Sequence, residues 1–120
     1  MAFDGAEKRR YPRIKANFIV SYRVLEESGD IDSSQTKNFS LGGMLFTTNR
    51  FFEKGTSLAL RIRLPFESNP VEIAAKVVDS REIVKNLIYD TRIEFFPDKE
   101  KQNGAMKQTV DYYLKKKGKL

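Results

Sequence analysis

Two short segments of the chain contain the residues best suited to binding chemistry. The first is Arg9-Arg10-Tyr11-Pro12-Arg13, with Lys8 before it, and the second is Asn38-Phe39-Ser40-Leu41-Gly42-Gly43. A guanidinium group makes paired hydrogen bonds to phosphate oxygens or to the O6 and N7 atoms of guanine. The second segment adds an amide, a hydroxyl and two glycines, which permit a positive φ and a close approach of the backbone. Together the segments predict an anion site, with a phosphate or a guanine nucleotide as its ligand.

In order and spacing, these segments resemble the two signatures of the PilZ domain, the bacterial receptor module for cyclic di-GMP. The family signatures are Arg-x-x-x-Arg, usually extended by a preceding basic residue, and Asp/Asn-x-Ser-x-x-Gly. The resemblance implies that the arginines contact phosphates and guanine Hoogsteen edges, and that the second segment contacts the other face of the ligand. The candidate ligand-binding residues are Lys8, Arg9, Arg10, Arg13, Asn38, Ser40, Gly42 and Gly43.

Asn38 departs from the commonest form of the second signature, in which Asp occupies this position. A carboxylate accepts hydrogen bonds from guanine N1–H and N2–H₂ together, whereas Asn38 matches this edge only when its carbonyl faces the base. Asn is an allowed variant of the family signature. The substitution predicts a lower affinity for the ligand.

The composition argues against most enzyme classes and against a metal or other cofactor. The 120 residues suffice for one domain and include no Cys and no His, which removes the commonest nucleophiles, general bases and metal ligands. The formal net charge of +6 favours anionic partners. We therefore expect a non-catalytic binding protein that needs no cofactor.

The pattern along the chain predicts three parts and a cytoplasmic location. Residues 1–15 read as a flexible basic arm that a ligand would order, residues 16–97 as a barrel, and residues 98–120 as a helix with a basic tail. No stretch approaches the roughly 18 apolar residues of a membrane span, and the N-terminus lacks the pattern of a secretory signal. We expect no insertion into a membrane.

Alternating apolar and polar residues predict a mainly β protein, a six-stranded antiparallel barrel. The clearest alternation runs through Leu58, Leu60, Ile62 and Leu64. Residues 26–34 are predicted to form a turn or hairpin loop. The arginines outside the N-terminal segment and Arg23 are expected mostly to face solvent from strands; they are Arg50, Arg61, Arg63 and Arg92. The predicted strands are 16–24, 43–47, 57–64, 71–78 and 87–96, with 36–39 leading into the second segment.

The end of the chain has the periodicity of an amphipathic helix, from about residue 99 to 117. Met106, Val110, Tyr113 and Leu114 fall at i, i+4, i+7 and i+8 and so share one helix face. We expect this helix to cover an open end or face of the barrel.

Three function classes remain open at this level. The first is a cytoplasmic, non-catalytic cyclic di-GMP receptor that changes conformation on binding and signals to a protein partner. The second is a PilZ-like interaction module that binds no nucleotide. The third, single-stranded nucleic-acid binding, is less favoured, because the aromatic residues that could stack on bases (Phe18, Tyr22 and Phe46) alternate as core residues do.

Overall fold

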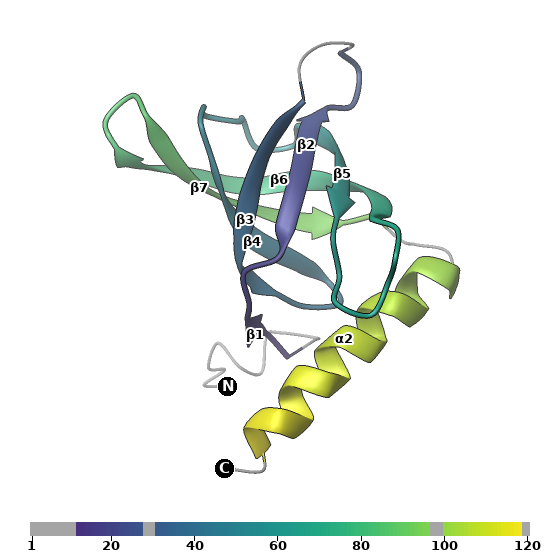
Figure 1. Cartoon of the computed structure of the whole chain (residues 1–120). Coiled ribbons are helices and arrows are strands. Elements are labelled where there is room, and N and C mark those ends of the chain that lie inside the picture. The colour runs from purple at the N-terminus through teal and green to yellow at the C-terminus, as the bar shows by residue number, and fades with distance from the viewer. Residues whose placement is uncertain (1–11, 28–30, 97–99, 119–120) are drawn as a thin grey trace, which may run out of the picture.

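The computed structural model describes residues 12–27, 31–96 and 100–118. Within these ranges the chain forms seven strands followed by one helix, α2 (Figure 1). The helix spans Glu100–Gly118. The strands are β1 (Ile14–Lys15), β2 (Ile19–Val24), β3 (Asp32–Phe39), β4 (Gly43–Thr48), β5 (Ser57–Ile62), β6 (Val71–Val84) and β7 (Ile88–Phe95).

Six of these strands close into an antiparallel barrel. They follow the order β3, β2, β5, β6, β7, β4, and β4 also pairs with β3, which joins the two ends of the sheet. The two-residue strand β1 pairs with the end of β3. The predicted six-stranded antiparallel barrel with a C-terminal helix is confirmed.

The barrel interior is filled by the apolar residues of the alternating pattern. In β5 the side chains of Leu58, Leu60 and Ile62 are at most 2% exposed. Tyr22 and Phe46 pack edge to face inside the barrel, with ring centroids 5.2 Å apart, and Phe18 is also buried. These three aromatic rings are therefore core residues, as predicted, and are not exposed for stacking on nucleic-acid bases.

Helix α2 lies across one end of the barrel (Figure 1), where it contacts β6 and β1. Met106 and Val110 on its inner face are fully buried, and Tyr113 and Leu114 pack against the core. The Tyr113 ring meets Phe18 edge to face at 5.7 Å between centroids. The predicted helix and its apolar face are confirmed.

The predicted loop over residues 26–34 is wrong at its end, because β3 already begins at Asp32. The cause is tertiary pairing: Tyr22 lies opposite Asp32 and Ser21 opposite Ser33 in the β2–β3 ladder. The first residues of β3 are polar because several of them face solvent. Local composition therefore resembles a loop although the backbone is held in a strand.

Two other predicted boundaries also differ from the structure. The predicted arm, residues 1–15, ends in strand β1, where Ile14 is buried; residues 1–11 lie outside the described part of the chain. The strand predicted over 71–78 continues to Val84, because β6 keeps pairing with β7 up to the turn at Asn86, whose φ is +61°. This long hairpin projects beyond the barrel (Figure 1).

Candidate functional site

Strand β1 joins the end of the first segment to the second. Ile14 pairs with Phe39 and Lys15 with Asn38 in an antiparallel ladder. Arg13 directly precedes β1, so it lies next to the end of β3 and the start of the turn that follows. The structure thus brings Arg13 beside the second segment, whereas Lys8, Arg9 and Arg10 lie outside the described residues.

Ser40 shapes the turn that follows β3. Its hydroxyl accepts hydrogen bonds from the backbone N–H groups of Gly42 and Gly43, at 3.1 and 3.2 Å, and donates one to the Gly43 carbonyl at 3.1 Å. The Ser40 N–H also donates to that carbonyl, at 2.9 Å. One donor and two acceptor positions are all that a hydroxyl has. A ligand contact through Ser40 would therefore replace one of the bonds that build the turn.

Gly43 is required by the closure of the barrel. A Cβ added there would lie 2.1 Å from the Ile93 carbonyl oxygen, on the neighbouring strand β7. The φ of Gly43 is outside the left-handed region, so a positive φ does not explain this glycine. Next to it, the Gly42 carbonyl accepts a hydrogen bond from the Phe95 N–H at 2.9 Å. The structure thus shows a close approach of Gly43 to β7, and the approach of the glycines to a ligand stays a prediction.

Asn38 presents its amide on the outer surface of the barrel. It is half-buried, while its neighbour Phe39 is fully buried in the core. The β3–β4 register shifts between Thr36 and Asn38, and the residue between them, Lys37, forms an ion pair with Asp90 at 2.8 Å. The Asn38 side chain makes no hydrogen bond to a described residue. Its donor and acceptor are therefore available to a ligand.

A row of outward-facing residues crosses the strands at the level of Asn38. Asn38 pairs with Lys15 on one side and with Leu45 on the other, and Leu45 pairs in turn with Arg92 of β7. Directly paired residues share one face of a sheet. The sequence predicted Arg92 only as one of several mostly solvent-facing arginines, but it is half-buried. Its alternation with the core residues Thr91 and Ile93 signals an outward position, yet no sequence pattern reveals that β7 lies beside β4.

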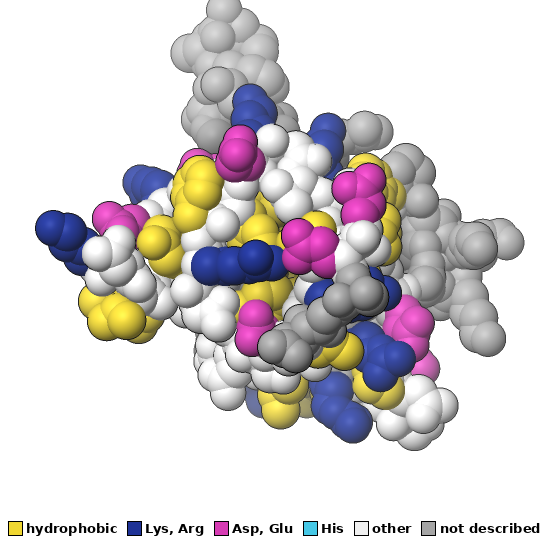
Figure 2. Space-filling view, turned by 90° about the horizontal axis from the view of Figure 1, so that it is seen from above, with side chains coloured by type: hydrophobic (Ala, Val, Ile, Leu, Met, Phe, Trp, Pro, Cys, Tyr) yellow, Lys and Arg dark blue, Asp and Glu magenta, His cyan; other side chains and the backbone are white. Residues whose placement is uncertain are grey.

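Charges of both signs surround the end of the barrel that faces away from α2. Figure 2 shows basic and acidic side chains there, mixed with exposed hydrophobic groups. The described residues on this face form no broad patch of a single sign. On this face, the described residues therefore form no extended basic surface of the kind that binds nucleic acid.

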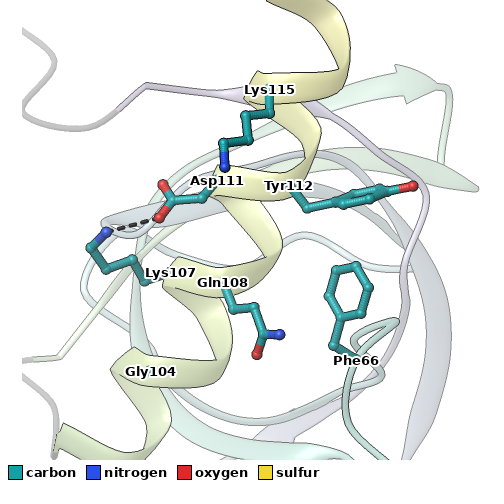
Figure 3. Close-up of a pocket in the computed structure, with 7 residues that line it drawn as sticks. All are labelled: Phe66, Gly104, Lys107, Gln108, Asp111, Tyr112 and Lys115. Atoms are coloured by element: carbon teal, nitrogen blue, oxygen red, sulfur yellow. Dashed lines mark hydrogen bonds and ion pairs between the residues drawn. The ribbon is translucent and has the colours of Figure 1, made fainter.

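A hollow lies along the outer side of α2, and its lining includes none of the predicted site residues. It has a volume of about 530 Å³. Phe66 and Tyr112 form its aromatic wall, with ring centroids 5.0 Å apart, and an ion pair of 2.8 Å joins Lys107 to Asp111 on its other side (Figure 3). The lining residues are Phe66, Gly104, Lys107, Gln108, Asp111, Tyr112 and Lys115.

The sequence of residues 7–114 matches the family model of the PilZ domain. The chain belongs to the PilZ domain family. PilZ domains are typically non-catalytic binding modules. No curated protein matches the chain. Among the described residues of this PilZ domain, no helix combines the length and the apolar character needed to cross a membrane.

Several solved structures share this fold. The Bacillus subtilis inhibitor of motility, MotI/DgrA, is 25% identical with a TM-score of 0.71; the match covers 90% of this chain and 52% of that one, so this chain spans about half its length. The PilZ domain of Escherichia coli YcgR, solved with c-di-GMP, is 15% identical with a TM-score of 0.66 over 91% of this chain and 93% of that one. The K. pneumonia MrkH–c-di-GMP complex is 18% identical with a TM-score of 0.69 over 93% and 55% of the two chains.

Proposed function

We propose that this PilZ protein is a non-catalytic, cytoplasmic receptor for cyclic di-GMP that binds where its two signature segments meet. The observation that carries the proposal is the ladder between β1 and β3, which sets Arg13 beside the segment from Asn38 to Gly43. The complexes of YcgR and MrkH with c-di-GMP support this choice of ligand. Other guanine nucleotides share part of its chemistry and serve as controls.

In this proposal the basic segment supplies charge and Asn38 supplies recognition of a base. Cyclic di-GMP offers two phosphates and two guanines, enough to engage Arg13 together with Lys8, Arg9 and Arg10. Each charge-assisted hydrogen bond contributes roughly 1.5 to 3 kcal/mol, against about 1 to 2 kcal/mol for each backbone residue that becomes ordered. Several simultaneous contacts are therefore needed. Ser40, Gly42 and Gly43 hold the turn that positions Asn38.

The proposed output is a conformational change that a protein partner detects. Aromatic contacts support a route to α2: the Phe39 ring, between Asn38 and Ser40 in sequence, meets Phe18 at 5.4 Å, and Phe18 meets Tyr113 of the helix at 5.7 Å. A ligand that shifts β3 would move the ring on which the helix packs. Interiors packed this closely transmit small displacements.

Isothermal titration calorimetry tests the proposal. We expect cyclic di-GMP to bind and GTP and a short oligonucleotide not to bind comparably. Arg13→Ala should weaken binding roughly 10- to 150-fold, because it removes charge-assisted hydrogen bonds. Arg61→Ala is the matched control, since Arg61 is exposed on β5 and pairs only with Glu72, at 3.2 Å, on the described surface. Wild-type protein that shows no heat and no NMR shift at millimolar ligand would refute the receptor function.

A second candidate, a PilZ-like interaction module that binds no nucleotide, is favoured by the tip of the β6–β7 hairpin. Ile83 and Leu87 are 51% and 63% exposed there, with Val84 and Ile88 beside them. Clustered apolar side chains on a projecting hairpin suit a protein contact. Ligand binding that is absent in the titration, together with loss of partner binding in a Leu87→Ser variant, would favour this candidate over the receptor.

A further inference from the structure

Arg92 is a half-buried arginine of strand β7. Its side chain is on the outer surface, because the flanking residues Thr91 and Ile93 point into the core and are at most 2% exposed. The Arg92 side chain makes no hydrogen bond or ion pair with any described residue. A guanidinium carries five N–H donors and no acceptor. All five remain available to a ligand at the barrel surface.

Across the strands, only Leu45 of β4 lies between Arg92 and Asn38. Leu45 pairs with Asn38 on β3 and with Arg92 on β7. Two interstrand spacings of about 4.8 Å separate the backbones of Asn38 and Arg92 by roughly 10 Å. The half-buried Leu45 between them is an apolar platform with a polar side chain on each side. A flat purine base resting on Leu45 would turn one edge to Asn38 and another to Arg92.

The charges around Arg92 favour a neutral base over a phosphate. Asp79 on β6 is the cross-strand partner of Arg92, and Asp90 and Glu94 lie two residues away on the same face of β7. Of these three carboxylates, Asp90 is paired with Lys37. Acidic neighbours repel a phosphate but have no such effect on an uncharged base. The basic first segment is better placed for the phosphates.

We propose that Arg92 is a further specificity-determining residue, which binds the O6 and N7 atoms of a guanine seated on Leu45 while Asn38 binds the Watson–Crick edge. A guanidinium fork is the commonest protein contact to these two acceptors. This inference rests on the proposed cyclic di-GMP receptor function. It adds to the site a residue from β7, far in sequence from both signatures.

Titration calorimetry with cyclic di-GMP and with its analogue containing 7-deazaguanine, which lacks N7, tests the assignment. Arg92→Ala should weaken binding of cyclic di-GMP roughly 5- to 150-fold, the range of a bidentate base contact. Arg92→Met keeps the apolar stem and should show the same loss. Arg61→Ala should bind as wild type does. Thermal unfolding of each variant checks that the barrel is intact.

The analogue identifies the atom that Arg92 contacts. We expect 7-deazaguanine to weaken binding to wild-type protein clearly more than binding to Arg92→Ala, because the variant has already lost the contact to N7. An equal penalty in both proteins, or wild-type affinity in both Arg92 variants, would overturn the assignment of Arg92 and leave the receptor function standing. Wild-type protein that binds no cyclic di-GMP would overturn the receptor function and this inference with it.

Discussion

Gly43 belongs to a ligand signature and at the same time lies where β4 approaches β7 too closely for a side chain. The Ile93 carbonyl occupies the place of its Cβ, and the hydroxyl of Ser40 is saturated by the turn that contains Gly43. Both residues therefore shape the backbone around Asn38. Loss of ligand binding in variants of Gly43 or Ser40 does not by itself identify a direct contact.

We expect Gly43→Ala to lower the free energy of unfolding by about 1 to 3 kcal/mol, the usual cost of overpacking. The added Cβ would meet backbone atoms of β7 that cannot move without opening the barrel. Gly104→Ala is the matched control: beyond its chain neighbours and its own helix backbone, the new Cβ would meet no atom within 4 Å, and in an exposed helix the change should add about 0.8 to 1 kcal/mol of stability. Urea denaturation measures both, and equal stabilities of the two variants would contradict this account.

At the scale of elements, Thr36 of β3 holds the connection between β1 and β2. Its buried hydroxyl donates to the Ala16 carbonyl at 2.5 Å and accepts from the Phe18 N–H at 2.9 Å, while the Asn17 amide donates to the Thr36 carbonyl at 2.8 Å. The predicted strand over 16–24 begins only at Ile19 for this reason. Side-chain hydrogen bonds to Thr36 take the place of a regular ladder.

Thr36→Val should lower the free energy of unfolding by about 1 to 3 kcal/mol for each backbone group that is left buried without a hydrogen-bond partner. Thr36→Ser keeps the hydroxyl and loses a methyl group, so it should cost only about 0.8 kcal/mol. Urea denaturation measures the stabilities. Amide hydrogen exchange should become faster over residues 14–18 in the Val variant. A Ser variant less stable than the Val variant would show that packing at Thr36 matters more than its hydrogen bonds.

For the molecule as a whole, burial of Tyr22 predicts a loss of stability at alkaline pH. Tyr22 is 2% exposed, and its hydroxyl donates to the Asn49 side chain and accepts from the Asn49 N–H. Burial raises the pKa of Tyr22 above the ordinary value of 10.0 and outweighs the hydrogen bond from the Asn49 backbone, which lowers it; the charge of Asp32 raises the pKa by less, and that of Arg50 lowers it by less still. The folded state therefore favours the protonated phenol.

Folding raises the pKa of Tyr22. The protonated phenol therefore contributes stability that is fully present below about pH 10 and is lost as the pH rises through the folded-state pKa. We expect the free energy of unfolding of wild-type protein to fall more steeply above about pH 10 than that of Tyr22→Phe. Urea denaturation at several pH values measures the difference. Parallel curves for the two proteins would mean that Tyr22 does not control this pH dependence.

Much of this PilZ domain was predictable from local patterns in the sequence. The alternation in β5 and the four apolar positions of α2 depend on the period of a single element, and both agree with the structure. The types and spacing of Asn38, Ser40 and Gly43 likewise indicated a binding segment before any fold was known. Such features follow from neighbouring residues alone, because each secondary structure repeats its side-chain directions at a fixed interval.

Only the tertiary structure decided how distant segments meet. The pairing of β1 with β3 sets Arg13 next to the end of β3, and the pairing of β4 with β7 explains Gly43 and brings Arg92 into the row of Asn38. The polar start of β3 became a strand for the same reason. Strand partners are chosen by closure of the barrel around a shared core, and this choice leaves no periodic trace in the sequence of any one strand.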